Sequence, residues 1–426
     1  MANMNNAKQL FENIPGKNQK LVVISDLHLG DTRYIDGQTH TSVLDKYTHY
    51  PRSGPNETWV VREGHLDSFL ERLEHAKNEV APTDSPFDFM ILLGDIFDTS
   101  LATFQETIAN VQAFLDGVER SGLVKAFVYI PGNHDHHFWQ MINESYGIAQ
   151  TVQNWPQNGD PTKILPGPHH KQTDLAYDNS FLNALTGLPL HIVSPNALCK
   201  YNDGQTVYVF HHGHLFSKAF ILVSEIFEKL FEKVKDLEEL EALNAGWTEL
   251  GWFHIGQTKS FGEKVEVLYN QIRKGDEDAQ QRIATVIDEQ WKNLFKNMHW
   301  AYRWAVKGYA TPSKWFVKHK LTNILKRKSE TPGASDERNI GIVGMMDVIT
   351  QYMTHIVNLY DLHENMDVRL VFGHTHLYDK YTPNEPIDIA GKKINLSVYN
   401  CGAWQEADDQ NNRLLTIDAS GELVAY

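Results

Sequence analysis

Five short segments of this chain carry side chains that can bind divalent metal ions, and each follows an apolar run. In the first, Asp26 and His28 are two residues apart, so on extended chain their side chains share a face and can converge on one ion. Carboxylate and amide oxygens with imidazole nitrogens, and no thiolate, suit borderline metals. So many ligands exceed the needs of one ion but fit two ions about 3.5–4 Å apart. The segments are Asp26-x-His28, Gly94-Asp95-x-x-Asp98, Gly132-Asn133-His134-Asp135, His212-Gly213-His214 and Gly373-His374-x-His376.

Strands are expected just before these segments. A brief, β-branched run beginning at Leu21 predicts a buried strand, and the runs 87–93 and 124–130 predict two more. Helices are expected near 64–77 and 104–120. Alternation of strand and helix is typical of a mainly parallel sheet, whose strands place ligand-binding residues at their carboxyl ends.

Two loops separate these elements, and further predicted strands precede the fourth and fifth segments. Residues 30–61 and 150–177 are polar and contain Pro and Gly, so we predict irregular loops there. In the fourth segment either His211 or His212 could be the metal ligand. The further predicted strands are 207–210, 368–372, 394–399 and 414–417, with Ser420-Gly421 as a hairpin turn.

Composition narrows the class of protein. The chain has 426 residues, 42% of them hydrophobic, with a net charge of −15 that argues against general affinity for nucleic acid or anionic membranes. Its two cysteines provide no disulfide framework, which fits a reducing compartment. Residues 1–20 lack an apolar signal core, and we find no apolar run of about 18 residues that would predict a transmembrane helix. We therefore expect a cytoplasmic location.

Residues 217–360 have a helical pattern of apolar residues, unlike the alternating strands and helices of the rest of the chain. Apolar residues recur at helical spacing in 226–240 and 283–302, which predicts an all-helical insert or cap within a core formed by 1–216 and 361–426. Between Trp291 and Lys328 there are ten Lys or Arg and no Asp or Glu, interleaved with aromatic residues. This stretch could grip an anionic substrate or nucleic acid, lie peripherally on an anionic membrane, or be a solvated helix face.

The five segments, in this order, resemble those of the calcineurin-like metallophosphoesterases. The resemblance implies an α/β fold, a four-layer α/β/β/α sandwich, with two divalent metal ions; Mn is favoured, with Zn or Fe as alternatives. It implies that the first ion is held by Asp26, His28, Asp95 and His376. It implies that the second is held by Asp95, Asn133, His212 and His374, with Asp95 bridging.

The same resemblance implies roles for residues beside the metals. His134 would act as general acid or charge stabiliser over the phosphate, with Asp135 placed to orient it. His136 and His214 are expected to contact the substrate. We expect Asp98 to hydrogen-bond a metal ligand rather than bind metal itself. His212 is favoured as the ligand because His212-Gly213-His214 resembles a His-Gly-Asp of one branch of the family.

That branch includes the UDP-2,3-diacylglucosamine pyrophosphatases. Ser25-Asp26-Leu27-His28-Leu29-Gly30 and Asn400-Cys401-Gly402-Ala403-Trp404 also resemble it, whereas the branch often has Gly-Asn-Arg-Asp at 132–135 and a shorter insert. The implied function is hydrolysis of a phosphate ester or pyrophosphate by metal-bound hydroxide. The alternatives are a nuclease or phosphodiesterase acting on nucleic acid, and a non-catalytic scaffold of the same fold.

Overall fold

A computed structural model describes residues 19–35, 38–50, 58–80, 85–99, 102–142, 144, 173–175, 184–216, 234, 237–249, 278, 341–405 and 410–426. The chain divides into two compact units, one of Met1–Gln257 with Gly341–Tyr426 and one of Thr258–Ile340. The described helices and strands all belong to the first unit. The basic stretch 291–328 and most of the predicted insert lie outside the described residues.

Seven strands form the first sheet, in the order β17-β16-β1-β6-β7-β9-β8. Its centre is parallel from β1 to β9, and antiparallel strands close both edges. The strands are β1 (Leu21–Ile24), β6 (Phe89–Leu93), β7 (Phe127–Ile130), β8 (Thr173–Leu175), β9 (Leu190–Ser194), β16 (Leu415–Ile417) and β17 (Leu423–Ala425). The predicted hairpin at Ser420-Gly421 is confirmed, since β16 and β17 pair antiparallel across it.

The second sheet has six strands, in the order β10-β11-β12-β15-β13 with β14 also paired to β15. Strands β11, β12 and β15 are parallel. Its members are β10 (Asn196–Tyr201), β11 (Thr206–His211), β12 (Asp367–Phe372), β13 (Tyr378–Tyr381), β14 (Ile387–Ile389) and β15 (Lys392–Cys401). Of the later predicted strands, 207–210, 368–372 and 394–399 therefore belong to this second sheet, whereas 414–417 returns to the first sheet as β16 and pairs with β1.

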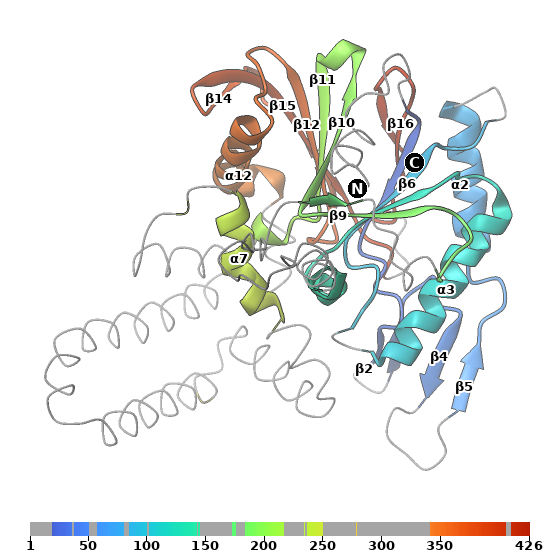
Figure 1. The fold of residues 1–426 in the computed structure, drawn as a ribbon. Helices are drawn as coiled ribbons and strands as arrows, with labels where there is room; N and C mark the ends of the chain where they lie inside the picture. Colours follow the sequence, from blue (N-terminus) through green and yellow to red (C-terminus); the bar gives the residue numbers. More distant parts are fainter. Residues whose placement is uncertain are drawn as a thin grey trace, which may run out of the picture. The chain divides into compact units, whose positions relative to one another are not determined.

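Apolar side chains alternate between two environments along each central strand. In β1, Val22 packs with the helices α2 (Asp67–Val80) and α3 (Phe104–Ser121), whereas Val23 packs with residues of the second sheet. The other face of the second sheet packs against α12 (Met346–Leu359) and the start of α7 (Leu237–Thr248). Figure 1 shows α2 and α3 on one side of the strands and α7 and α12 on the other.

Helix α3 lies close to its predicted bounds because its ends are encoded locally. The Thr103 hydroxyl accepts from the Glu106 amide, and the Glu106 carboxylate accepts from the Thr103 amide, which forms a capping box. Gly122 ends the helix in the left-handed conformation. Among the described residues, no helix is long and apolar enough to cross a membrane.

Residues 30–61 were predicted as a loop, and that prediction is wrong for the half of the segment that forms strands. It contains two antiparallel hairpins, β2 (Thr32–Ile35) with β3 (Gln38–Thr41), and β4 (Tyr47–Tyr50) with β5 (Thr58–Val61). Strands β2, β3 and β4 are mostly polar, and the apolar residues of β5 are exposed, so these strands lack the buried apolar run of a central strand. Short 3₁₀ turns are η2 (Asn202–Gly204), η3 (His214–Phe216) and η6 (Ile342–Met345).

The contact between the sheets should be a main source of stability. Phe210 is 0% exposed in the cluster between them and stacks on Tyr208. Phe210→Ala should lower the free energy of unfolding by about 3–5 kcal/mol, because it removes a buried ring and leaves a cavity. Urea unfolding measures the effect. Val424→Ala, at a 39% exposed position of β17, is the control and should change stability by no more than about 0.5 kcal/mol. Equal effects of the two substitutions would contradict this packing.

Candidate metal centre

The predicted ligands gather where the carboxyl ends of strands from both sheets meet. Asp26, Asp95 and Asn133 follow β1, β6 and β7, whereas His212 and His374 follow β11 and β12. Hydrogen bonds join the two sets across the sheets. The His374 amide donates to Asp26 Oδ2 at 2.8 Å, and His212 Nδ1 lies 2.9 Å from the Leu93 carbonyl. The site is thus built from both sheets.

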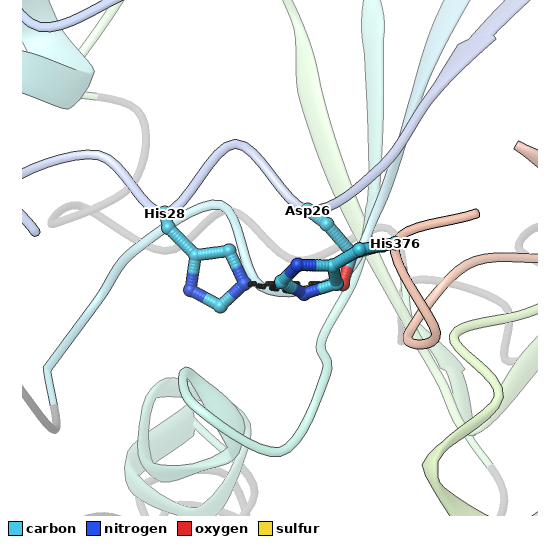
Figure 2. Close-up of side chains that lie close together, drawn as sticks. All are labelled: Asp26, His28 and His376. Carbon is cyan, nitrogen blue, oxygen red and sulfur yellow. Dashed lines mark hydrogen bonds and ion pairs between the residues drawn. The ribbon is translucent and has the colours of Figure 1, made fainter. Parts of the chain in front are cut away.

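Asp26, His28 and His376 form the first group (Figure 2). His376 Nε2 lies 3.2 Å from His28 Nε2 and 3.3 Å from Asp26 Oδ1. Ligand atoms about 2.1 Å from one ion, at tetrahedral or octahedral angles, lie about 3–3.5 Å apart. Two of the three separations fall in this range, and the third, between Asp26 Oδ1 and His28 Nε2, is 3.9 Å, so the group is close to the spacing of ligands that share a cation.

Asp95, His212 and His374 form a second such group, and Asn133 adjoins it. His212 Nε2 lies 3.2 Å from Asp95 Oδ2 and 3.3 Å from Asn133 Oδ1. Asp95 Oδ2 is also 3.9 Å from His28 Nε2 in the first group. One carboxylate oxygen therefore faces both groups.

The hydrogen bonds of His28 and His212 fix which ring nitrogen can bind metal. The Nδ1 of His28 lies 2.9 Å from Asp98 Oδ2, and the Nδ1 of His212 lies 2.9 Å from a carbonyl. Both partners only accept, so each Nδ1 carries a proton and each neutral ring presents the lone pair of Nε2 to the site. Burial and the nearby His212 lower the pKa of His374 to about 3, which keeps that ring neutral as well.

Asp26 supplies a further test of the fit. Its Oδ2 accepts from Ser25 Oγ and from the His374 amide, whereas its buried Oδ1 has no hydrogen-bond partner. A buried carboxylate oxygen without a partner is costly. The Oδ1 atom faces the imidazoles of the first group, where a cation would compensate it. The residues present therefore fit bound divalent metal.

The backbone at the site has a feature that sequence reasoning missed. Asp26, His28, Asp95, His374 and His376 all have positive φ, between 46° and 69°. Side chains other than glycine adopt this region at a cost, and such residues cluster at functional sites. Gly132, which lies against Asp95, is also required: a Cβ at this position would collide with the carboxylate and the backbone amide of Asp95. Here the backbone turns sharply to bring side chains together.

His134 sits beside the metal groups, with its ring 4.7 Å from that of His28. Its Nδ1 lies 3.3 Å from Asp98 Oδ1, and its amide donates to Asp95 Oδ1 at 2.8 Å. Burial alone lowers the pKa of His134, but Asp98 and Asp95 raise it to about 10. The ring can therefore hold a proton at neutral pH. Asp98 contacts both histidines, which matches its expected place behind a metal ligand.

Asp135 does not make the contact expected of it. The carboxylate that lies against the His134 ring is that of Asp98. Asp135 instead accepts hydrogen bonds from the backbone amides of Ile96, Phe97 and Gly132. Its side chain turns toward the loop backbone because those buried amides need an acceptor. Asp135 thus joins the second and third segments.

His136 and His214, the residues expected to contact substrate, are only 5% and 4% exposed. The ring of His214 lies 5.3 Å from that of His211 and 5.6 Å from that of His212, and burial lowers its pKa well below the usual range. His137 has a more exposed side chain, at 22%. The side chain of His137 is thus more exposed than that of His136, and contact of His136 and His214 with the substrate stays a prediction.

Two glutamates near the site went unrecognised in the sequence. Glu249 lies 2.7 Å from the Nδ1 of both His136 and His137, and Glu241 lies 3.8 Å from His211 Nε2. The only sequence signal is that α7 and its end carry acidic residues, which is equally typical of a solvated helix. Pairing α7 with residues more than 100 positions earlier requires the tertiary fold.

The choice between His211 and His212 follows from their directions. Successive residues at the end of β11 point to opposite sides, and His212 faces Asp95 while His211 packs against Phe216 and Tyr352. His211, His214 and Glu241 also lie within ligand distance of one another. However, His211 Nδ1 accepts from the Gly213 amide at 2.8 Å, so its proton is on the Nε2 that faces Glu241. The neutral ring of His211 therefore has no lone pair on Nε2, and binding metal there would require breaking the hydrogen bond from the Gly213 amide.

Metal affinity should depend on pH through His212. Burial alone lowers its pKa, but Asp95 and Asp26 raise it to about 9. Metal requires the neutral ring, so binding below pH 9 must displace a proton, and affinity should rise with pH, by about tenfold per unit for each proton displaced. Titration calorimetry of Mn or Zn into metal-free protein, in two buffers of different ionisation enthalpy, counts the protons. Affinity that is constant from pH 6 to pH 8 would contradict the assignment.

Comparison with known families supports the same chemistry. The model of the calcineurin-like phosphoesterase family matches residues 19–236, just over half of the chain and four of the five segments. The fifth segment, with His374 and His376, lies outside the match, but the fold brings it to the same site. No curated protein matches the chain significantly. The chain belongs to the calcineurin-like phosphoesterase family and is a metal-dependent phosphoric ester hydrolase.

Proposed function

We propose that the protein hydrolyses a phosphate ester or pyrophosphate bond at a centre of two divalent metal ions. The observation that carries the proposal is the position of Asp95 Oδ2, 3.2 Å from His212 Nε2 and 3.9 Å from His28 Nε2. One oxygen directed at two separate ligand groups suits a bridge between two cations. Burial alone would raise the pKa of Asp95, but His212, His134 and His28 lower it well below its usual range, so the carboxylate is charged.

The proposed ligands follow from the two groups. Asp26, His28, Asp95 and His376 would hold one ion, and Asp95, Asn133, His212 and His374 the other. When bound, the ions would supply an activated water and neutralise charge on the phosphoryl oxygens. Nitrogen and oxygen ligands without thiolate suit Mn, Zn and Fe alike; of these we propose Mn, with Zn or Fe as alternatives.

His134 is proposed as the general acid. Asp98 engages Nδ1, so the proton available to a leaving group is the one on Nε2. A protonated imidazole here can neutralise the departing oxygen as the ester bond breaks. Asp98 is the positioning residue for this ring, and Asp135 holds the loop backbone that carries it.

We also infer the larger architecture. The apolar cluster between the sheets and the two on their helix-covered faces support a four-layer α/β/β/α sandwich. The proposed boundaries remain a core of 1–216 and 361–426 with a helical insert at 217–360. Contact of 291–328 with nucleic acid or a membrane surface stays a prediction. A cytoplasmic location is supported by two free buried cysteines, Cys199 and Cys401.

The substrate class can be found with one panel. Activity with added Mn should be measured on a phosphomonoester, a bis-aryl phosphodiester, a nucleoside diphosphate-sugar and single-stranded DNA, with metal content determined on the same sample. We expect about two metal ions per chain and turnover of one class. Turnover of DNA that falls steeply with salt would select the nuclease alternative. A chain without metal or turnover would leave the scaffold alternative.

Replacing the bridging carboxylate tests the binuclear assignment. Asp95→Asn removes the negative charge that faces both groups, so turnover should be abolished and both ions bound more weakly. Metal content and single-turnover rates measure these effects. Asp361→Asn is the matched control, because that side chain is 84% exposed and should leave both unchanged. Retained activity in Asp95→Asn would overturn the assignment.

Removing the general acid should separate rate from metal binding. His134→Ala should keep two metal ions but lose about 10²- to 10⁴-fold in rate for esters with poor leaving groups. Esters with good leaving groups, which need no proton, should lose much less. Rates across aryl esters of graded leaving-group pKa measure the difference. Loss of bound metal instead would mean that His134 is a ligand.

A further inference from the structure

Glu249 directly follows α7 and contacts the two residues that come immediately after the third segment. Its Oε1 lies 2.7 Å from His136 Nδ1, and its Oε2 lies 2.7 Å from His137 Nδ1. The side chains of Glu249, His136 and His137 are 14%, 7% and 22% exposed. A single, largely buried carboxylate thus binds two consecutive histidines with both of its oxygens.

This contact fixes both rings. An ionised carboxylate only accepts hydrogen bonds, so each histidine must donate the proton on Nδ1. Burial alone raises the pKa of Glu249, but the hydrogen bonds from His136 and His137 lower it to about 2. The carboxylate is therefore charged at neutral pH, and short hydrogen bonds to it are among the stronger ones in proteins.

The two histidines stand next to the reacting loop. His136 is the first helical residue of 136–142, immediately after the loop that carries Asn133 and His134. The loop is tied to the first sheet through Asp135, which accepts from the Gly132 and Ile96 amides, and through Thr99, which donates to the His134 carbonyl. Glu249 holds the following turn from a different element, α7.

We propose that Glu249 is a positioning residue: by binding His136 and His137 it fixes the turn that follows His134 and so keeps the His134 ring placed against the leaving group. This inference rests on the proposed hydrolytic function. It connects α7, within the segment expected as the insert, to the proton transfer. Glu249 touches neither the metal groups nor the substrate in this scheme and acts only through the loop.

The test is Glu249→Gln. A carboxamide has one accepting oxygen, and its NH₂ cannot accept the second Nδ1 proton, so one histidine must change tautomer or turn away. We expect two metal ions to remain and kcat to fall about tenfold for a phenyl ester, but less than threefold for a 2,4-dinitrophenyl ester of the class that the wild type hydrolyses. Glu239→Gln, at an exposed position of α7, is the control and should match the wild type.

A double-variant cycle separates positioning from general weakening of the fold. If Glu249 acts through His134, Glu249→Gln should have no further effect in a His134→Ala background. Equal losses on both esters, additive losses in the double variant, or an unchanged rate would each overturn the proposal. If Glu249→Gln does not fold, the same comparisons can be made with Glu249→Asp, which keeps the charge on a side chain shorter by one methylene group.

A readout without turnover distinguishes this proposal from the proposed function. The ¹⁵N chemical shifts of the imidazoles report which nitrogen carries the proton. Protonated Nδ1 on both His136 and His137, with one of them altered in Glu249→Gln, is the expected result. Unaltered rings would overturn the contact itself. A wild type with these tautomers but no turnover of any ester would instead overturn the hydrolytic function.

Discussion

Four carboxylates lie buried together where the two sheets meet, and the site depends on compensating their charge. Asp26, Asp95, Asp98 and Asp135 are each no more than 1% exposed. Asp98 is compensated by two imidazoles, and Asp135 by backbone amides. Asp26 and Asp95 each accept an amide on one oxygen and direct the other at imidazole nitrogens. Bound cations would complete this balance, because buried charge without a partner is costly.

Bringing these buried side chains to one place also accounts for the strained backbone at the strand ends. Side chains that simply followed their strands would alternate between the two faces of a sheet. Positive φ at Asp26, Asp95 and His374 lets the chain turn at the strand ends and aim these groups at a common point. The cost is offset by the packed sheets beneath, in which Val23, Ile91 and Phe210 are fully buried. Rigid strands thus hold a geometry that a free loop would relax.

Hydrogen bonds behind the ligands decide what the ligands can do. A carbonyl and a carboxylate set the tautomers of His212 and His28 in favour of metal binding, whereas a backbone amide sets that of His211 against it. His211 and His212 are consecutive in the sequence, but only His212 presents an Nε2 lone pair that can bind metal. The helical segment takes part as well, since Glu249 binds the turn after His134.

The sequence by itself determined the family, the five segments and most central strands, because short apolar runs followed by closely spaced ligands are local signals. The capped helix α3 was predictable for the same reason. Only the tertiary structure decided that the segments divide between two sheets, that Asp98 rather than Asp135 contacts His134, and that Glu249 reaches His136. The hairpins within 32–61 were missed because three of their four strands are mostly polar. These features depend on residues far apart in the chain, whose pairing is set by packing rather than by local pattern.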